Sequence, residues 1–113
     1  MIGSRQRLNS NLLVVVVRKV FTYRFSPNLA IERFSDEAIL FVAELDALIT
    51  VNRGAADFFE AAVKAFSDRS FGREEVTEWF QSSFDLPAED VAAKLLPLLA
   101  FAVRHGIVVK NNV

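Results

Sequence analysis

The sequence predicts an α+β fold in which a three-stranded antiparallel sheet is followed by three α-helices. Two observations give this order. Before Asn52, apolar residues alternate or form short runs, which is typical of strands. After Asn52 they recur every three or four positions, which is typical of amphipathic helices. The length of 113 residues favours one domain.

Three short runs predict the strands. Residues 30–35 (AIERFS) alternate and follow the turn signal SPN. Residues 38–43 (AILFVA) are an apolar run too short for a normal helix. A polar turn at residues 44–46 then separates this run from residues 47–51 (ALITV), so we expect the second and third strands to form a hairpin.

Capping and breaking residues delimit the predicted helices. Asn52 suits a helix N-cap before the apolar stripe of residues 54–66, and residues 67–72 are predicted to be loop. A shorter helix follows, and the third begins at Pro87 and ends at Gly106, with Pro97 predicted to bend it. Residues 107–109 are expected to be extended. The order of elements predicts a winged helix-turn-helix-like topology.

Composition excludes several classes of function. Basic and acidic residues number 13 and 14, so no strong field attracts nucleic acid or a membrane. The absence of cysteine excludes disulfides, thiolate metal sites and thiol nucleophiles, and suits a cytoplasmic location. No nucleophile elbow, phosphate loop or metal-ligand spacing occurs. We therefore expect a protein that is not an enzyme and needs no cofactor or metal.

Residues 1–27 are predicted to be an N-terminal extension. Their apolar run, residues 12–17, is too short for a signal peptide or a membrane span. Residues 20–25 (VFTYRF) alternate, which predicts an added strand or a loosely held tail. The alternative is an interaction segment that pairs with a sheet edge in this molecule or in a second copy, which would give a homodimer.

From residue 28 to residue 110 the chain resembles the PqqD-like family, named after the pyrroloquinoline quinone biosynthesis protein D. The resemblance rests on "LITVNRGAADFF", "FGREEVTEWFQSSFDLPAEDV" and "LLPLLAFAVRHGIV". Two positions differ from the family pattern, Lys94 in place of an acidic residue and Pro97 inside the third helix. The resemblance implies a RiPP recognition element: a non-catalytic protein that binds the leader of a precursor peptide and presents it to a modifying enzyme, often of the radical S-adenosylmethionine type.

A peptide is expected to add as a strand along the third predicted strand, with the third helix as the other wall. On a helical wheel, Lys94, Leu98 and Phe101 fall in one sector beside the core stripe. The candidate peptide-binding residues are therefore Ala47, Leu48, Ile49, Thr50, Val51, Lys94, Leu98 and Phe101.

Each of these assignments has an alternative. Leu98 and Phe101 also suit the rim of a core, and Lys94 also suits a helix-surface pair with Asp90.

The competing function is a winged-helix DNA-binding regulator. That class needs basic or amide side chains at the leading end of the third helix, whereas Glu89 and Asp90 are acidic. We therefore expect no specific binding to duplex DNA.

Overall fold

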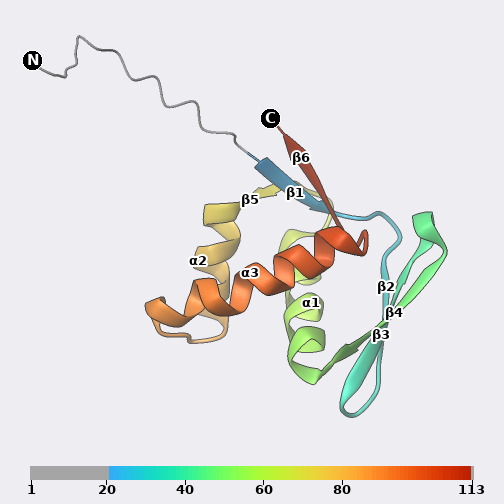
Figure 1. The fold of residues 1–113 in the computed structure, drawn as a ribbon, viewed down its shortest axis with the longest axis horizontal. Coiled ribbons are helices and arrows are strands. Elements are labelled where there is room, and N and C mark those ends of the chain that lie inside the picture. The colour runs from blue at the N-terminus through green and yellow to red at the C-terminus, as the bar shows by residue number, and fades with distance from the viewer. Residues whose placement is uncertain (1–20, 113) are drawn as a thin grey trace, which may run out of the picture.

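The computed structural model describes residues 21–112 and has the predicted α+β architecture, with a three-stranded sheet preceding three helices (Figure 1). Residues 1–20 of the predicted N-terminal extension, including the apolar run at residues 12–17, lie outside the described residues. In chain order the elements are β1 (Phe21–Phe25), β2 (Ala30–Arg33), β3 (Glu37–Val42), a 3-10 turn (Ala43–Leu45), β4 (Ala47–Asn52), α1 (Arg53–Phe66), β5 (Phe71–Gly72), α2 (Arg73–Ser83), α3 (Ala88–Arg104) and β6 (Val108–Asn112).

The larger part of the fold is built on the antiparallel sheet β2-β3-β4. Each predicted strand lies within one residue or two of its expected position. The first ends at Arg33, before the predicted end at Ser35, because Phe34 donates its N–H to the carbonyl of Glu37 at 2.8 Å and closes a tight turn. The predicted turn between the other two strands is the 3-10 segment, and Asp46 ends it in the left-handed conformation.

The added strand predicted at residues 20–25 is confirmed as β1, and it belongs to a second antiparallel sheet, β5-β1-β6, that was not predicted. Tyr23 and Phe25 are only 3% and 8% exposed, and their rings contact Phe71 with centroids 5.8 and 5.7 Å apart. Residues 21–25 are therefore an added strand with core side chains and not a tail. The predicted loop at 67–72 is also corrected, since Phe71 and Gly72 pair with β1.

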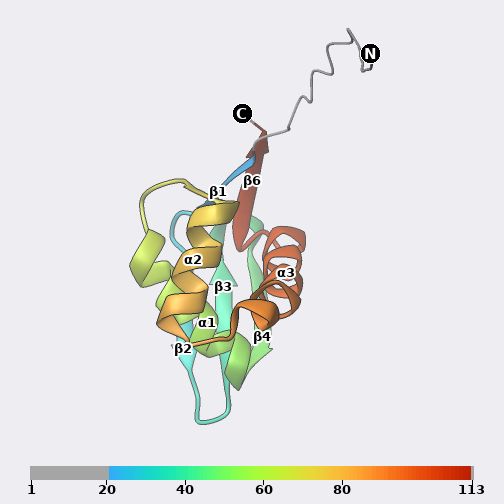
Figure 2. The ribbon, with the colours of Figure 1, turned by 90° about the vertical axis from the view of Figure 1, so that its left-hand side faces the viewer.

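Helix α1 packs against the inner face of the β2-β3-β4 sheet, and α2 lies beyond it (Figure 1). Figure 2 shows α3 on the β4 side of this sheet, away from β2. Asn52 caps α1 as predicted, accepting the Ala55 N–H at 2.9 Å. Pro87 is the N-cap of α3 and not its first residue, and α3 continues through Pro97 to Arg104. The residues with the largest fully buried side chains are Phe59, Leu40, Leu95, Ile107, Val42 and Val76.

The corner between α3 and β6 depends on Gly106. Its φ of 73° is left-handed, and the N–H groups of Gly106 and Ile107 bond to the carbonyls of Val103 and Ala102 at 3.2 and 2.9 Å. This is the Schellman pattern that closes a helix. Ser26 is buried at this corner, and both of its donors are satisfied there. Its hydroxyl donates to the Gly106 carbonyl and its N–H donates to the Ile107 carbonyl. The connection from β1 to β2 is thereby tied to the end of α3.

Candidate functional site

Strand β4 is an edge strand, because within the described residues it pairs only with β3. The register identifies which of its backbone groups face outward. The bond from Phe34 to Glu37 makes these two residues a hydrogen-bonded pair, and such pairs alternate along an antiparallel ladder. Glu37 thus points its backbone N–H and C=O groups toward β2. The alternate residues of β3, which are the buried Ala38, Leu40 and Val42, therefore point theirs toward β4. Their partners on β4 are Val51, Ile49 and Ala47, which leaves the N–H and C=O groups of Leu48 and Thr50 on the open edge.

A surface hollow of about 290 Å³ lies between this edge and α3. Thr50, Val51 and Asn52 line it from β4, and Pro97, Leu98 and Phe101 line it from α3. Ala55, in the first turn of α1, also lines it. Its surface is therefore mostly apolar. We call this the edge hollow.

A second hollow, of about 360 Å³, continues from the first past Leu98, which lines both. We call it the aromatic hollow, since Phe58, Phe80 and Phe84 line it with Leu86. The Phe80 and Phe84 rings lie 5.1 Å apart, and that of Phe58 lies 5.2 Å from Phe80. Together the two hollows form one apolar track along the side of α3.

The polar groups around the aromatic hollow are Lys94 and Asp57. Asp57 accepts a hydrogen bond from Arg33 at 2.8 Å, and this bond, with a second to Glu60 at 3.0 Å, raises the pKa of the guanidinium. These bonds join β2 to α1. Lys94 is exposed and has no salt bridge to Asp90 or to any other described residue. Its ammonium group therefore has no described ionic partner beside the track.

The structure brings together part of the predicted site. Thr50, Val51, Leu98 and Phe101 line the edge hollow, and Lys94 lines the aromatic hollow. Ala47, Leu48 and Ile49 lie farther along β4 and line neither hollow, although Leu48 is 71% exposed. Phe101 fits both interpretations of the sequence. Its ring is half-buried with its centroid 6.4 Å from that of Phe59, as expected at the rim of the core, and it also lines the edge hollow, as expected of a peptide-binding residue.

Sequence reasoning did not identify the remaining lining residues, which are Asn52, Ala55 and Pro97 in the edge hollow and Gly54, Asp57, Phe58, Phe80, Phe84 and Leu86 in the aromatic hollow. The sequence pattern gives Asn52 and Pro97 structural roles, as a helix cap and a helix breaker. One usable signal was present: Phe84 and Leu86 flank the corner between α2 and α3, where apolar side chains often border a cavity.

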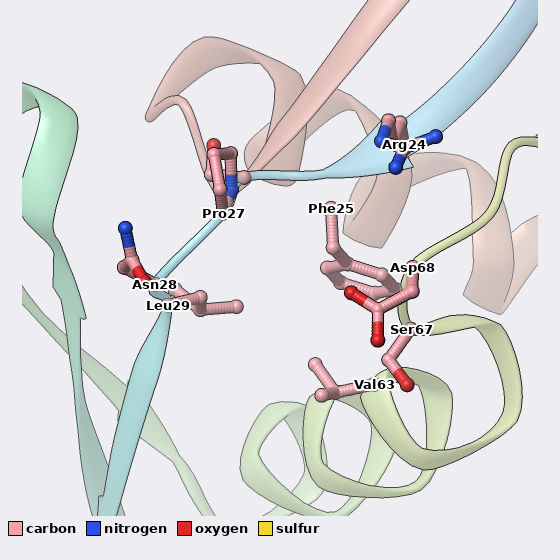
Figure 3. A pocket seen from close by; sticks show the side chains of 9 residues that line it. Arg24, Phe25, Pro27, Asn28, Leu29, Val63, Ser67 and Asp68 are labelled. Atoms are coloured by element: carbon pink, nitrogen blue, oxygen red, sulfur yellow. The ribbon is translucent and has the colours of Figure 1, made fainter.

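A third hollow, of about 200 Å³, lies where the β1–β2 connection passes the end of α1. Figure 3 shows Phe25, Leu29 and Val63 in this hollow, with Arg24 and Asp68 also in view. Asn28 and Asp68, which line it, have positive φ values of 62° and 65°, as short polar residues in tight turns often do. These features fit a joint between two turns, and we assign it no binding role.

No family model, curated protein or solved structure matches the chain. Within residues 21–112 no helix has the length and apolar character needed to cross a membrane. In the same residues, histidine and acidic side chains form no cluster of three or more suited to a metal ion.

Proposed function

We propose that the protein binds an extended peptide, which adds as a strand to the open edge of β4 while α3 forms the other wall. One observation carries this proposal: the outward backbone groups of β4 and the apolar edge hollow lie side by side. Backbone bonds to Leu48 and Thr50 would supply affinity that is independent of sequence, and the hollow would select side chains.

The lining residues define the preferred peptide. An aliphatic or aromatic side chain would fill the edge hollow between Val51 and Leu98, and a second would reach the aromatic hollow. An acidic residue beside the second anchor would pair with Lys94. The preferred segment is thus apolar at alternate positions with one carboxylate.

The biological role that we propose rests on the resemblance to the PqqD-like family. In this role the protein is a cytoplasmic, non-catalytic recognition element that holds the leader of a precursor peptide for a modifying enzyme, such as a radical S-adenosylmethionine enzyme. The exposed edge and the neighbouring hollows support such a role because they offer peptide contacts along one face.

The test uses peptides selected from a displayed library of short unstructured sequences, with calorimetry on the selected binders. Replacing Leu98 or Phe101 with alanine is expected to weaken binding by about 1–3 kcal/mol, as for interface anchors. Glu78→Ala, an exposed position on α2, is the control and should bind as the parent does. Thermal melts of each variant separate lost binding from lost folding. Unchanged affinity in folded variants at both positions would eliminate this groove.

The competing DNA-binding function makes a different prediction. The leading end of α3 exposes Pro87, Ala88 and Glu89, and none of these side chains suits a phosphate or a base edge. We expect no sequence-selective binding to duplex DNA at near-physiological salt. A salt-dependent mobility shift that one duplex shows and a scrambled duplex does not would favour the regulator instead.

A further inference from the structure

A second surface lies on the other flank of α3. A hollow of about 450 Å³ is bordered there by Leu96, Leu99 and Val103, and by Tyr23 of β1. At about 100° per residue, Leu96 and Val103 point roughly opposite to Leu98 and Phe101, with the buried stripe of α3 between the two pairs. This surface is therefore separate from the peptide groove proposed above, and the inference does not depend on that groove.

Three cations gather around this hollow from three elements: Arg73 begins α2, Arg104 ends α3, and Lys110 lies on β6. None of the residues that line it is acidic. The salt bridges among the described residues involve Arg33, Arg53 and Arg69, and none involves these three cations. The overall charge of the chain is nearly balanced, yet the described residues place a cluster of positive charge here that has no acidic partner among them.

Helix electrostatics account for only part of this cluster. Arg104 at the end of α3 interacts favourably with the negative end of the helix. Arg73 is at the positive end of α2, where a cation is unfavourable. The Lys110 ammonium group lies 4.1 Å from the Phe21 ring centroid, which holds it near β1. Among the described residues, Arg73 in particular has no salt-bridge partner that would offset this position.

The floor of the hollow is apolar. Leu96 is 43% exposed although it lies mid-helix, and Leu99, three residues farther along α3, is buried. Tyr23 is almost completely buried, and its hydroxyl forms no hydrogen bond to another described residue, whereas buried tyrosine hydroxyls usually have a partner. An exposed leucine in a hollow that three cations also line resembles a protein interface more than a solvated helix face.

We propose that this basic hollow docks an acidic segment of a partner protein in which glutamate or aspartate residues flank a leucine or phenylalanine. The carboxylates would pair with Arg73, Arg104 and Lys110, and the apolar side chain would cover Leu96. Nucleic acid fits less well because its backbone offers nothing to the apolar floor. The chain's own leading segment carries Arg5, Arg7, Arg18 and Lys19, so its charge is of the wrong sign.

The test measures fluorescence anisotropy with three probes: a labelled glutamate–leucine peptide, the same peptide with glutamine in place of glutamate, and a labelled DNA duplex. The full chain should bind the glutamate peptide, and raising the salt should weaken binding. Arg73→Gln and Arg104→Gln should each weaken it roughly two- to fivefold, as for an exposed ion pair. Leu96→Ala should weaken it as well. Lys64→Gln removes an exposed cation of α1 that lies outside the hollow and should leave binding unchanged.

Amide shifts induced by the glutamate peptide should centre on the end of α3 and the start of α2. No binding of that peptide, equal binding of the glutamine peptide, or an equal loss in Lys64→Gln would each overturn the proposal. Tighter binding of the duplex, with competition against the peptide, would assign the hollow to nucleic acid instead.

Discussion

Replacing Phe25 with alanine tests whether β1 belongs to the folded domain. The side chain is 8% exposed, and its ring contacts Phe71. Truncating a buried phenylalanine costs about 3–5 kcal/mol. We expect a value near the lower limit, about 3 kcal/mol, because Phe25 also borders the open hollow of Figure 3, into which neighbouring side chains can relax.

This loss would be a large part of the total stability. At about 0.05–0.15 kcal/mol per residue, a domain of this size is stabilised by roughly 5–15 kcal/mol. Removing residues 1–25 deletes both Tyr23 and Phe25 and leaves β5 and β6 without their shared partner, so the truncated chain should lose cooperative unfolding. Removing residues 1–20 keeps every described core residue and serves as the matched truncation.

Urea denaturation monitored by circular dichroism measures these differences. Arg24→Ala, an exposed neighbour on the same strand, should change the free energy of unfolding by less than about 0.5 kcal/mol. If Phe25→Ala were as stable as Arg24→Ala, or if the chain without residues 1–25 still unfolded cooperatively, the burial of β1 would be refuted and the tail interpretation restored.

Two further predictions concern single residues. Gly106→Ala should destabilise the domain by about 1–2 kcal/mol because an L-residue is strained at its φ of 73°, whereas Gly54→Ala, inside α1, should be neutral or stabilising; equal urea midpoints for the two variants would contradict this. The hydrogen bond from Arg69 lowers the pKa of the Glu75 carboxyl. The contribution of this bond to the free energy of unfolding is therefore present above the ordinary carboxyl pKa, and it is lost as the pH falls through the lowered pKa. The stability difference between the parent and Glu75→Gln should therefore shrink on acidification, and a difference that grew in acid would have the wrong sign.

Local signals in the sequence were sufficient to predict most of the β2-β3-β4 sheet and the three helices. The side chain of Asn52 caps a helix through a bond three residues away, and Gly106 ends one by its own backbone conformation, so neither depends on distant parts of the chain. The alternation of residues 20–25 correctly put Tyr23 and Phe25 on one side. It carried no information about what covers that side.

The features that sequence reasoning did not predict depend on distant contacts. Phe71 and Gly72 are a strand only because β1 lies beside them, and two residues are too few for a periodic signal. Part of the candidate site was predicted from the sequence. The strand pattern places Thr50 on the strand with the open edge, and the helix pattern places Leu98 on the helix that forms the other wall. Concavity arises from how α1, α2 and α3 pack together, and for this reason Ala55 and Phe84 were missed.

Amide hydrogen exchange on β4 tests the open edge and its occupation most directly. In the peptide-free protein, the amides of Ile49 and Val51 should be protected by β3, while those of Leu48 and Thr50 should exchange rapidly. Adding a selected peptide should slow exchange at Leu48 and Thr50 and leave Ile49 and Val51 little changed. Rapid exchange at Leu48 and Thr50 with the peptide bound, or protection of all four amides without it, would contradict strand addition at this edge.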